Sequence, residues 1–279
     1  MAGVLFEGGS FRAIFSAGVM DALLDAKVQF PYCIGVSAGA AYCASYLSGQ
    51  KKRNLDMLTQ YRNDKRYMGL RNYFKKERSI FGVDFVFRQM PNRLFPFDME
   101  TFQSYPGDFV IVTTDAATGK PKYFHKEDVD RDYNVFCASC ALPVYFQAVS
   151  IGGARYYDGG VSDPVPIDKL QQDGNEKALI VLTRPEGYRK TCGRSDRFAS
   201  KMIKRKYPVV AQNLLKRYQK YNESVAKCEE WERQGKAVIL RPTEPIDSFE
   251  KDVQRLRYFY DMGYTMAQEH MSEISALFG

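Results

Sequence analysis

The feature that most constrains the fold is a serine held between two glycines, where a short apolar run meets a helix-like run. The stretch YCIGVSAGAAYCASYL covers residues 32–47 and contains Gly35-Val36-Ser37-Ala38-Gly39. Gly-x-Ser-x-Gly between a strand and a helix is typical of a nucleophile elbow, a tight turn that exposes the hydroxyl above a sheet. Composition alone supplies such a pentapeptide in about one chain in ten of this length, so its neighbours decide what it means.

The elements before the serine predict the start of a parallel sheet. GVLF at 3–6 is typical of a short buried strand, and a glycine-bearing loop follows at 7–13. Residues 14–26 place apolar side chains at helical spacing, and FPYCI at 30–34 predicts a second strand. Strand, loop, helix, strand, elbow and helix in this order indicate a βαβ unit with helices over the faces of the sheet.

The rest of the chain extends this architecture. We expect irregular or partly helical cover at 51–105, a hairpin at 108–124, a helix at 134–143 stopped by a proline, a turn-rich loop at 156–170, strands at 177–184 and 237–242, and an amphipathic C-terminal helix. The prediction is a three-layer α/β/α fold with a mostly parallel central sheet. Residues 1–185 would form the catalytic domain, and 186–279 a mainly helical extension packed on it, with one strand near 237–241.

The sequence offers no signal peptide pattern and no apolar run near the roughly 20 residues of a spanning helix. We therefore expect a cytoplasmic protein, either free or peripheral at the inner membrane surface, with its six cysteines reduced. Cys137 and Cys140 form a C-x-x-C pair, but neither of the two histidines, His125 and His270, stands at ligand spacing. We predict core packing for this pair, with no metal and no cofactor.

Basic residues gather in the stretch 189–220, within a chain of net charge +7. Asp196 is the only acid among Arg189, Lys190, Arg194, Arg197, Lys201, Lys204, Arg205, Lys206, Lys216, Arg217 and Lys220. Such a run suits an anionic membrane surface, and a solvated helical face explains it equally well. No nucleic-acid-binding motif accompanies the charge, so we expect no nucleic-acid partner. The sequence does not indicate an oligomeric state.

A serine nucleophile needs backbone N–H groups that stabilise the oxyanion, and the loop EGGSFRA at 7–13 could supply them. Gly8, Gly9 and Ser10 leave the first strand on the edge where the elbow should lie, because the ends of neighbouring parallel strands share one edge. Arg12 either fixes this loop or attracts an anionic head group. A tight turn without chemistry is the simpler alternative.

The base that activates the serine is harder to find. His125 follows a hairpin strand, and His270 lies among polar residues of the C-terminal helix, so neither is a good candidate. A carboxylate in a site that tunes its pKa can serve instead. Asp158 is the best candidate, because Gly159 and Gly160 after it let the backbone turn sharply. Asp163 precedes a proline and is better explained as a turn cap.

Taken together, these motifs resemble those of bacterial patatin-like phospholipases. That family combines a loop Gly-Gly-Gly-x-Arg/Lys-Gly, a Gly-x-Ser-x-Gly elbow and an Asp-Gly-Gly/Ala motif, which stand here as GGSFRA (8–13), GVSAG (35–39) and DGG (158–160). The resemblance covers roughly residues 3–185 and includes ASCALP (138–143) and VSDPVP (161–166).

The resemblance implies a catalytic dyad without histidine. Ser37 would be the nucleophile and Asp158 the base, with amides of Gly8, Gly9 and Ser10 as the oxyanion hole. The motif glycines Gly35, Gly39, Gly159 and Gly160 and the loop residue Arg12 would support them. The expected reaction is hydrolysis of a lipid or acyl ester through an acyl-enzyme.

Two residues depart from the family loop: Ser10 replaces its third glycine and Ala13 its last. A serine forced to positive φ would be strained by about 1 kcal/mol or more. The alternative function is therefore a weakly active or inactive protein of the same fold that binds membrane surfaces as a scaffold.

Overall fold

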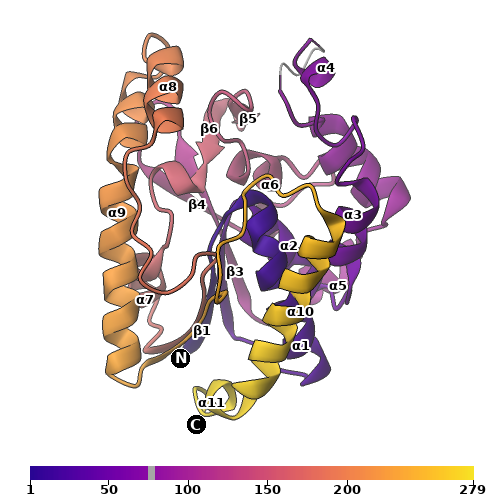
Figure 1. The fold of residues 1–279 in the computed structure, drawn as a ribbon, viewed down its shortest axis with the longest axis vertical. Helices are drawn as coiled ribbons and strands as arrows, with labels where there is room; N and C mark the ends of the chain where they lie inside the picture. The colour runs from indigo at the N-terminus through magenta and orange to yellow at the C-terminus, as the bar shows by residue number, and fades with distance from the viewer. Residues whose placement is uncertain (75–78) are drawn as a thin grey trace.

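A single mixed sheet runs through the protein, with helices on both of its faces (Figure 1). The computed structural model describes residues 1–74 and 79–279. Within them the sheet has eight strands, β1 Ala2–Phe6, β2 Tyr32–Val36, β3 Asp108–Asp115, β4 Pro121–His125, β5 Val149–Ile151, β6 Ala154–Asp158, β7 Lys177–Val181 and β8 Ala237–Leu240. The central strands β3-β2-β1-β7-β8 are parallel, and β4, β5 and β6 join antiparallel.

The helices form two outer layers, which gives the predicted α/β/α arrangement. One face of the sheet is covered by α7 Ile167–Gln172 and α9 Pro208–Arg233. The other face is covered by α1 Ile14–Asp25, α2 Ala38–Leu47, α5 Met99–Ser104, α6 Asn134–Ser139 and α10 Val253–Glu269. The remaining helices are α3 Arg53–Tyr61, α4 Leu70–Tyr73, α8 Arg194–Ile203 and α11 Met271–Ser275, with a π-helix over Phe85–Leu94 and short 3₁₀ turns at Ser10–Ala13, Lys126–Asp128 and Gly159–Val161.

The central strands of the sheet are continuous apolar runs in the sequence because both of their faces are buried. In β1, Val4 and Phe6 pack under α1 and α2, while Leu5 points to the layer of α7 and α9. All three side chains are fully buried. Each such side chain contributes about 1.5–3 kcal/mol by leaving water, so the register of β1 is fixed from both sides.

The strand β3 brings two other strands end to end. β4 pairs along one edge of β3. On the other edge, β2 pairs up to Val36 opposite Val112, and β6 takes over with Asp158 opposite Thr113. Because Val112 and Thr113 are consecutive, the residue that follows β2 meets the last residue of β6.

Residues beyond 185 complete this same architecture. β8 extends the sheet by pairing with β7, and α10 lies along α1 (Figure 1). The two helices touch through glycines, since a Cβ on Gly18 would lie 2.0 Å from the carbonyl oxygen of Tyr260 and one on Gly263 would lie 2.0 Å from that of Phe15. We propose a domain boundary between residues 185 and 186, with a C-terminal extension that supplies the edge strand β8 of the sheet.

Most of the expected elements are confirmed, including the hairpin of β3 and β4 and the strands β7 and β8. Three expectations are wrong. The predicted helix at 134–143 ends at Ser139, so Pro143 is not what stops it. The stretch 156–170 is not all loop, because β6 runs to Asp158 and α7 begins at Ile167. The second strand covers 32–36 rather than 30–34, since Pro31 has no N–H to donate to a neighbouring strand.

Candidate active site

The turn at Ser37 has a strained backbone and needs the glycines that flank it. Ser37 joins β2 to α2 with φ 54° and ψ −127°. A Cβ on Gly35 would lie 2.6 Å from the Cα of Ala40, and one on Gly39 would lie 2.5 Å from the carbonyl oxygen of Phe6. The glycines therefore let α2 pack directly on the strand ends, with its N-terminus at the serine.

Ser139 holds this turn in place, a role that the sequence did not reveal. The backbone N–H of Ser37 donates to Ser139 Oγ at 2.8 Å, and Ser139 Oγ donates to the carbonyl of Val112 at 2.7 Å. Ser139 is fully buried in α6. It lies within ASCALP, so its position in that motif was the signal that could have found it.

Asp158 is placed against the serine hydroxyl. Ser37 Oγ donates to Asp158 Oδ2 at 2.7 Å, and the backbone N–H of Gly160 donates to Oδ1 at 2.7 Å. The backbone of Asp158 is held as well, since its N–H donates to Ala141 and its carbonyl accepts from Thr114 Oγ1. The meeting of β2 and β6 on one edge of β3 thus produces a preorganised hydroxyl–carboxylate pair.

The environment of Asp158 tunes its basicity. Burial raises the pKa of Asp158 from its ordinary value to about 6. The hydrogen bonds from Ser37 and Gly160 and the more distant charges of Arg217 and Lys190 lower this pKa, but their effect is smaller than that of burial. A carboxyl group with a pKa near 6 is ionised at neutral pH and is a better proton acceptor than an exposed one.

The other candidates for the base lie elsewhere. His125 ends β4, and His270 ends α10, where it contacts Glu273. Neither histidine lines a cavity at Ser37. Asp163 is buried and accepts a hydrogen bond from the hydroxyl of Tyr123 at 2.8 Å, away from the serine.

The glycine-rich loop approaches the elbow closely enough to serve it. A Cβ on Gly8 would lie 2.9 Å from the Cβ of Ser37 and 2.8 Å from the carbonyl oxygen of Val36. Within the described residues, no acceptor pairs with the backbone N–H groups of Gly8, Gly9 or Ser10. These groups are therefore free to donate to an oxyanion formed at Ser37.

The two departures from the family loop differ in their cost. Ser10 has φ 52°, a conformation that a side chain strains, whereas Ala13 has φ −64°, which any residue adopts. Ala13 is also fully buried beneath the loop. The conformational cost of the departures therefore falls on Ser10 alone.

Replacing Ser10 by glycine should stabilise the protein by about 0.5–1 kcal/mol. Relief of left-handed strain, about 1–2 kcal/mol, exceeds the added chain entropy of glycine in the unfolded state, about 0.4–1 kcal/mol. Denaturant unfolding measures the effect, with Ser10→Ala as the matched control that keeps the Cβ. Equal stability of the glycine and alanine variants would contradict the strain.

Arg12 fixes the loop to the rest of the protein. Its guanidinium donates to Ser248 Oγ and, at 3.4 Å, to Thr183 Oγ1, while Thr183 Oγ1 donates to the carbonyl of Gly8 at 3.0 Å. Burial and the nearby Arg184 lower the pKa of Arg12. These contacts favour the anchoring role for Arg12 over direct attraction of a head group.

Two cavities of different character meet at Ser37 and Asp158. The apolar cavity is lined largely by aromatic and aliphatic side chains, among them Phe11, Tyr42, Phe81, Phe87, Phe136 and Phe146. The polar cavity has a volume of about 380 Å³ and contains Glu7, Arg12, Arg184, Lys190, Asp196 and Arg217 in its wall. Ser37, Asp158 and Ser10 line both, so an ester held at the serine would extend into each.

No cluster of three or more histidine, cysteine or acidic side chains suitable for a metal ion occurs in residues 1–74 and 79–279. Cys137 and Cys140 form no disulfide, and burial raises the pKa of Cys140 well above its ordinary value. None of the described helices is both long and apolar enough to span a bilayer.

Comparison with known families agrees with the fold and the motifs. Residues 4–170 match the model of the patatin-like phospholipases, and the chain belongs to this family. Residues 207–279, which include most of α9, β8, α10 and α11, match a domain of unknown function, DUF6363.

Two individual proteins are similar to this chain. The uncharacterized protein YjjU of Escherichia coli K12 is 27% identical over 186 residues, which are 64% of this chain and 51% of YjjU, so the chain spans about half the length of that relative. The structure of VipD from Legionella pneumophila matches with a TM-score of 0.48 and 11% identity, over 96% of this chain and 66% of VipD.

Proposed function

We propose that the chain is a serine hydrolase that cleaves acyl ester bonds of lipids, as a phospholipase A or lipid acyl hydrolase, through Ser37 and Asp158. The observation that carries the proposal is the buried 2.7 Å hydrogen bond from Ser37 Oγ to Asp158 Oδ2. The free amides of the glycine-rich loop and the strained elbow beside it support the same reading. Membership in the patatin-like family gives the hydrolase class.

The reaction follows from this geometry in two steps. Asp158 takes the proton of Ser37 as Oγ attacks the ester carbonyl carbon, and the loop amides hold the oxyanion. The proton then passes to the leaving alkoxide, so that an alcohol departs and an acyl-enzyme remains. Water attacks this second ester with Asp158 again as the base, and the carboxylic acid and free Ser37 are restored.

The apolar cavity is evidence that the acid part of the ester substrate is an acyl chain. Its aromatic and aliphatic wall begins at Ser37 and Ala38 and continues between α2, the π-helix and α6. Alkyl chains gain about 0.8 kcal/mol for each CH₂ group that leaves water. A long-chain ester should therefore bind better than an acetate ester.

A scaffold protein without catalysis is the alternative function. A fluorophosphonate probe separates the two, because it reacts with a serine hydroxyl only when a base and an oxyanion hole activate it. The folded protein should form one adduct, at Ser37. Absence of an adduct on the folded protein would reject the hydrolase and favour the scaffold.

Hydrolysis should depend on pH through Asp158. Asp158 must be deprotonated to act as the base, and burial raises its pKa to about 6. On the acidic side of the profile, kcat/KM should therefore reach a plateau above about pH 6. Below it, kcat/KM should fall by about tenfold for each pH unit. A pH profile with a soluble chromogenic ester measures the inflection, and an inflection near the ordinary aspartate value of about 4 would contradict the role of burial.

We also propose peripheral binding to an anionic membrane through the basic stretch 189–220. On α8, Phe198 and Met202 are 57% and 59% exposed. Exposed cations surround them at Arg194, Arg197, Lys201, Lys204, Arg205 and Lys206. Across the molecule, Leu70 on α4 and Phe74 directly after it are exposed, and both helices stand at the end of the molecule where the parallel strands terminate (Figure 1).

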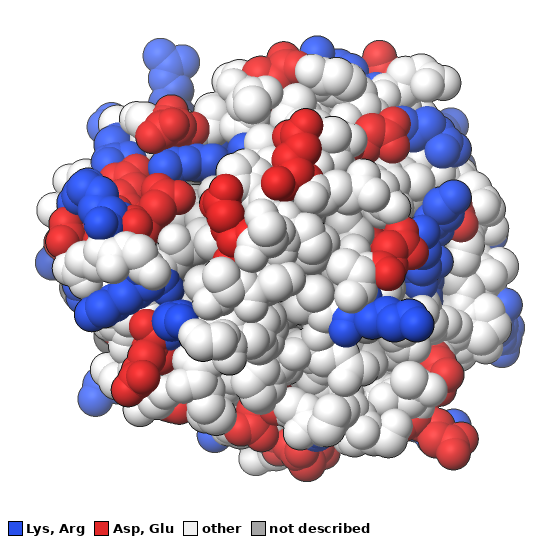
Figure 2. Space-filling view, turned by 90° about the horizontal axis from the view of Figure 1, so that it is seen from below, with Lys and Arg blue, Asp and Glu red and all other residues white. Residues whose placement is uncertain are grey.

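The opposite end of the molecule carries charges of both signs. Figure 2 shows acidic and basic side chains interspersed on the face that contains the amino ends of the parallel strands. We therefore expect an anionic membrane to contact the end of the molecule that also holds Ser37 and Asp158, where a lipid substrate would enter.

Liposome flotation tests this surface. The protein should float with vesicles that contain anionic lipid and not with neutral ones, because both apolar insertion and charge contribute. The double variant Phe198→Ser and Met202→Ser should reduce flotation several-fold. Exposed Phe278, beside the C-terminus at the opposite end of the molecule (Figure 1), provides the control Phe278→Ser, and equal loss in both variants would reject α8 as the contact.

A further inference from the structure

The wall of the apolar cavity contains a cation. Arg53, the first residue of α3, is half-buried and lines this cavity together with Ser37. Its guanidinium donates to the carbonyl oxygen of Phe95 from Nε at 3.3 Å and from Nη2 at 3.0 Å. Nη1 donates to Ser45 Oγ at 3.1 Å. Among residues 1–74 and 79–279, no carboxylate pairs with this guanidinium, so its charge has only neutral acceptors.

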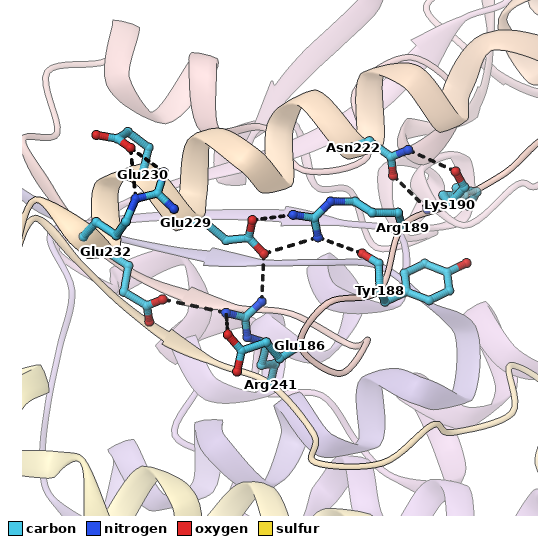
Figure 3. A network of polar contacts seen from close by, with 10 residues as sticks. Glu186, Tyr188, Arg189, Lys190, Asn222, Glu229, Glu230, Glu232 and Arg241 are labelled. Atoms are coloured by element: carbon cyan, nitrogen blue, oxygen red, sulfur yellow. Dashed lines mark hydrogen bonds and ion pairs between the residues drawn. The ribbon is translucent and has the colours of Figure 1, made fainter.

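Arg241 shows how an enclosed guanidinium is neutralised elsewhere in this protein (Figure 3). Its side chain is 12% exposed, and the carboxylates of Glu229, Glu186 and Glu232 lie 3.2, 3.4 and 3.7 Å from its nitrogens. Arg53 lacks such a set, and burial lowers its pKa to about 10. A guanidinium has five N–H donors, and the contacts of Arg53 with the protein are three hydrogen bonds. The remaining donors can bind a ligand.

A tyrosine hydroxyl accompanies the guanidinium. Arg53 Cζ lies 5.3 Å from the ring centroid of Phe97, and the ring of Tyr133 packs edge-on at 5.9 Å from the same centroid. All three residues line the apolar cavity. In the part of the chain that the structure describes, the hydroxyl of Tyr133 has no hydrogen-bond partner. Tyr133 also has φ 55°, a left-handed conformation that a side chain strains, and such strain is concentrated at functional positions.

The position of this pair relative to the nucleophile follows from α2. Ser45, which accepts from Arg53, stands about two helical turns after Ser37, so the two serines are about 12 Å apart along the helix axis. The side chains of α2 that line the cavity on this path are small, which leaves room for a chain beside the helix. They are Ala38, Ala41 and Ala44.

The length of this path sets the length of the chain that reaches Arg53. An extended hydrocarbon chain advances about 1.3 Å per bond, so an acyl group of about ten carbons spans the distance from Ser37. A plain chain of this length would cover a guanidinium with hydrocarbon, which removes water from a charge without replacing it. A chain that ends in a carboxylate would instead form charge-assisted hydrogen bonds with the remaining N–H groups.

We propose that Arg53 and Tyr133 bind a carboxylate at the far end of the acyl chain, so that the protein prefers half-esters of dicarboxylic acids of about ten carbons to plain acyl esters of that length. This inference rests on the proposed function and adds the acyl group that the cavity selects. A carboxylate fits better than a hydroxyl, because it supplies the negative charge that the surroundings of Arg53 lack.

Two chromogenic esters of equal chain length test the proposal: 4-nitrophenyl decanoate and the 4-nitrophenyl half-ester of decanedioic acid, both below the concentration at which they aggregate. Wild-type kcat/KM should be higher for the decanedioate ester by about tenfold or more. The corresponding esters of hexanoic and hexanedioic acid are the control, and here the plain chain should be preferred, because the shorter carboxylate ends among apolar side chains. A wild type that prefers decanoate to decanedioate would overturn the proposal.

Three variants locate the preference. Arg53→Met should lower the ratio of the two ten-carbon kcat/KM values by about tenfold or more, since the carboxylate loses its charged partner. Tyr133→Phe should lower it about threefold through the loss of one neutral donor, and it serves as the test if Arg53→Met fails to fold. Arg131→Met removes an exposed charge outside the cavity and should keep the wild-type ratio. An equal fall in Arg131→Met would indicate a general effect of positive charge and reject direct contact.

A binding measurement gives an answer that does not depend on turnover. Calorimetry with the Ser37→Ala variant should show binding of monomethyl decanedioate, and addition of Arg53→Met should weaken it by about tenfold or more. Monomethyl hexanedioate should bind at least about tenfold more weakly than the ten-carbon compound. Equal binding of the two compounds would contradict a carboxylate site at the far end of the cavity.

The kinetic outcomes separate this inference from the proposed function. Hydrolysis of the two ten-carbon esters at equal rates would overturn the carboxylate preference and leave the serine hydrolase intact. Failure to hydrolyse any of the four esters, together with no fluorophosphonate adduct at Ser37, would overturn the proposed function itself.

Discussion

Replacing Ser37 by alanine should lower kcat for ester hydrolysis by about 10⁴-fold or more, because loss of the nucleophile removes the covalent route. The fluorophosphonate adduct should disappear with it. The backbone should persist, since alanine keeps the Cβ at the same φ of 54° and Ser139 still binds the amide of residue 37. Steady-state kinetics and intact-protein mass spectrometry measure the two effects.

The control for this variant is His270→Ala. His270 lies at the end of α10, and its ring nitrogen Nδ1 lies 3.2 Å from Glu273 Oε2. Its replacement should leave kcat within a factor of about two, as for an ordinary surface change. Loss of activity in His270→Ala, with retention in Ser37→Ala, would reject the dyad and call for a conventional triad elsewhere.

Asp158→Asn should lower kcat by about 10³- to 10⁴-fold and at the same time stabilise the protein above pH 6. Asparagine has the shape of aspartate and can still accept from Gly160, but it cannot take the proton of Ser37. The activity loss reports the missing base, and kcat at pH 8 measures it.

The stability gain follows from linkage. The pKa of Asp158 is about 6 in the folded state, above its ordinary value of 3.8, so the folded state binds more protons than the unfolded state between these values. The wild type therefore loses stability as pH rises through this window, by about 3 kcal/mol in total. The asparagine variant escapes this loss.

Urea unfolding of both proteins at several pH values measures the difference. The stability of Asp158→Asn minus that of the wild type should rise between pH 4 and 6 and then stay constant. A difference that does not change with pH would contradict the raised pKa of Asp158, whatever the effect on activity.

The contact between Ser37 and Asp158 could be predicted because its signals are local. Ser37 stands in a pentapeptide whose glycines the elbow requires, and Asp158 stands beside two glycines that permit a close approach. The sequence could not show that Asp158 ends a strand rather than lying in a loop. That follows from β2 and β6 sharing one edge of β3, which is a long-range pairing.

The sequence also could not show the backbone conformation or the surroundings of single residues. Ser10 and Ala13 both replace a family glycine, yet only Ser10 adopts positive φ. Likewise, Lys190 was one cation in a long basic run, and its place in the cavity depends on Asn222 of α9. Contacts between segments far apart in sequence leave no periodic pattern, so spacing rules do not detect them.

The strand β8 and the glycine contact between α1 and α10 imply that the protein unfolds as one cooperative unit. Without β8, the strand β7 would present an unpaired edge, and β7 leads directly to Thr183, which holds both Glu7 and Gly8. Without α10, the buried face around Gly18 would meet water. The C-terminal segment is therefore not an exchangeable module: grafting another in its place would change the support of the glycine-rich loop as well as the edge of the sheet.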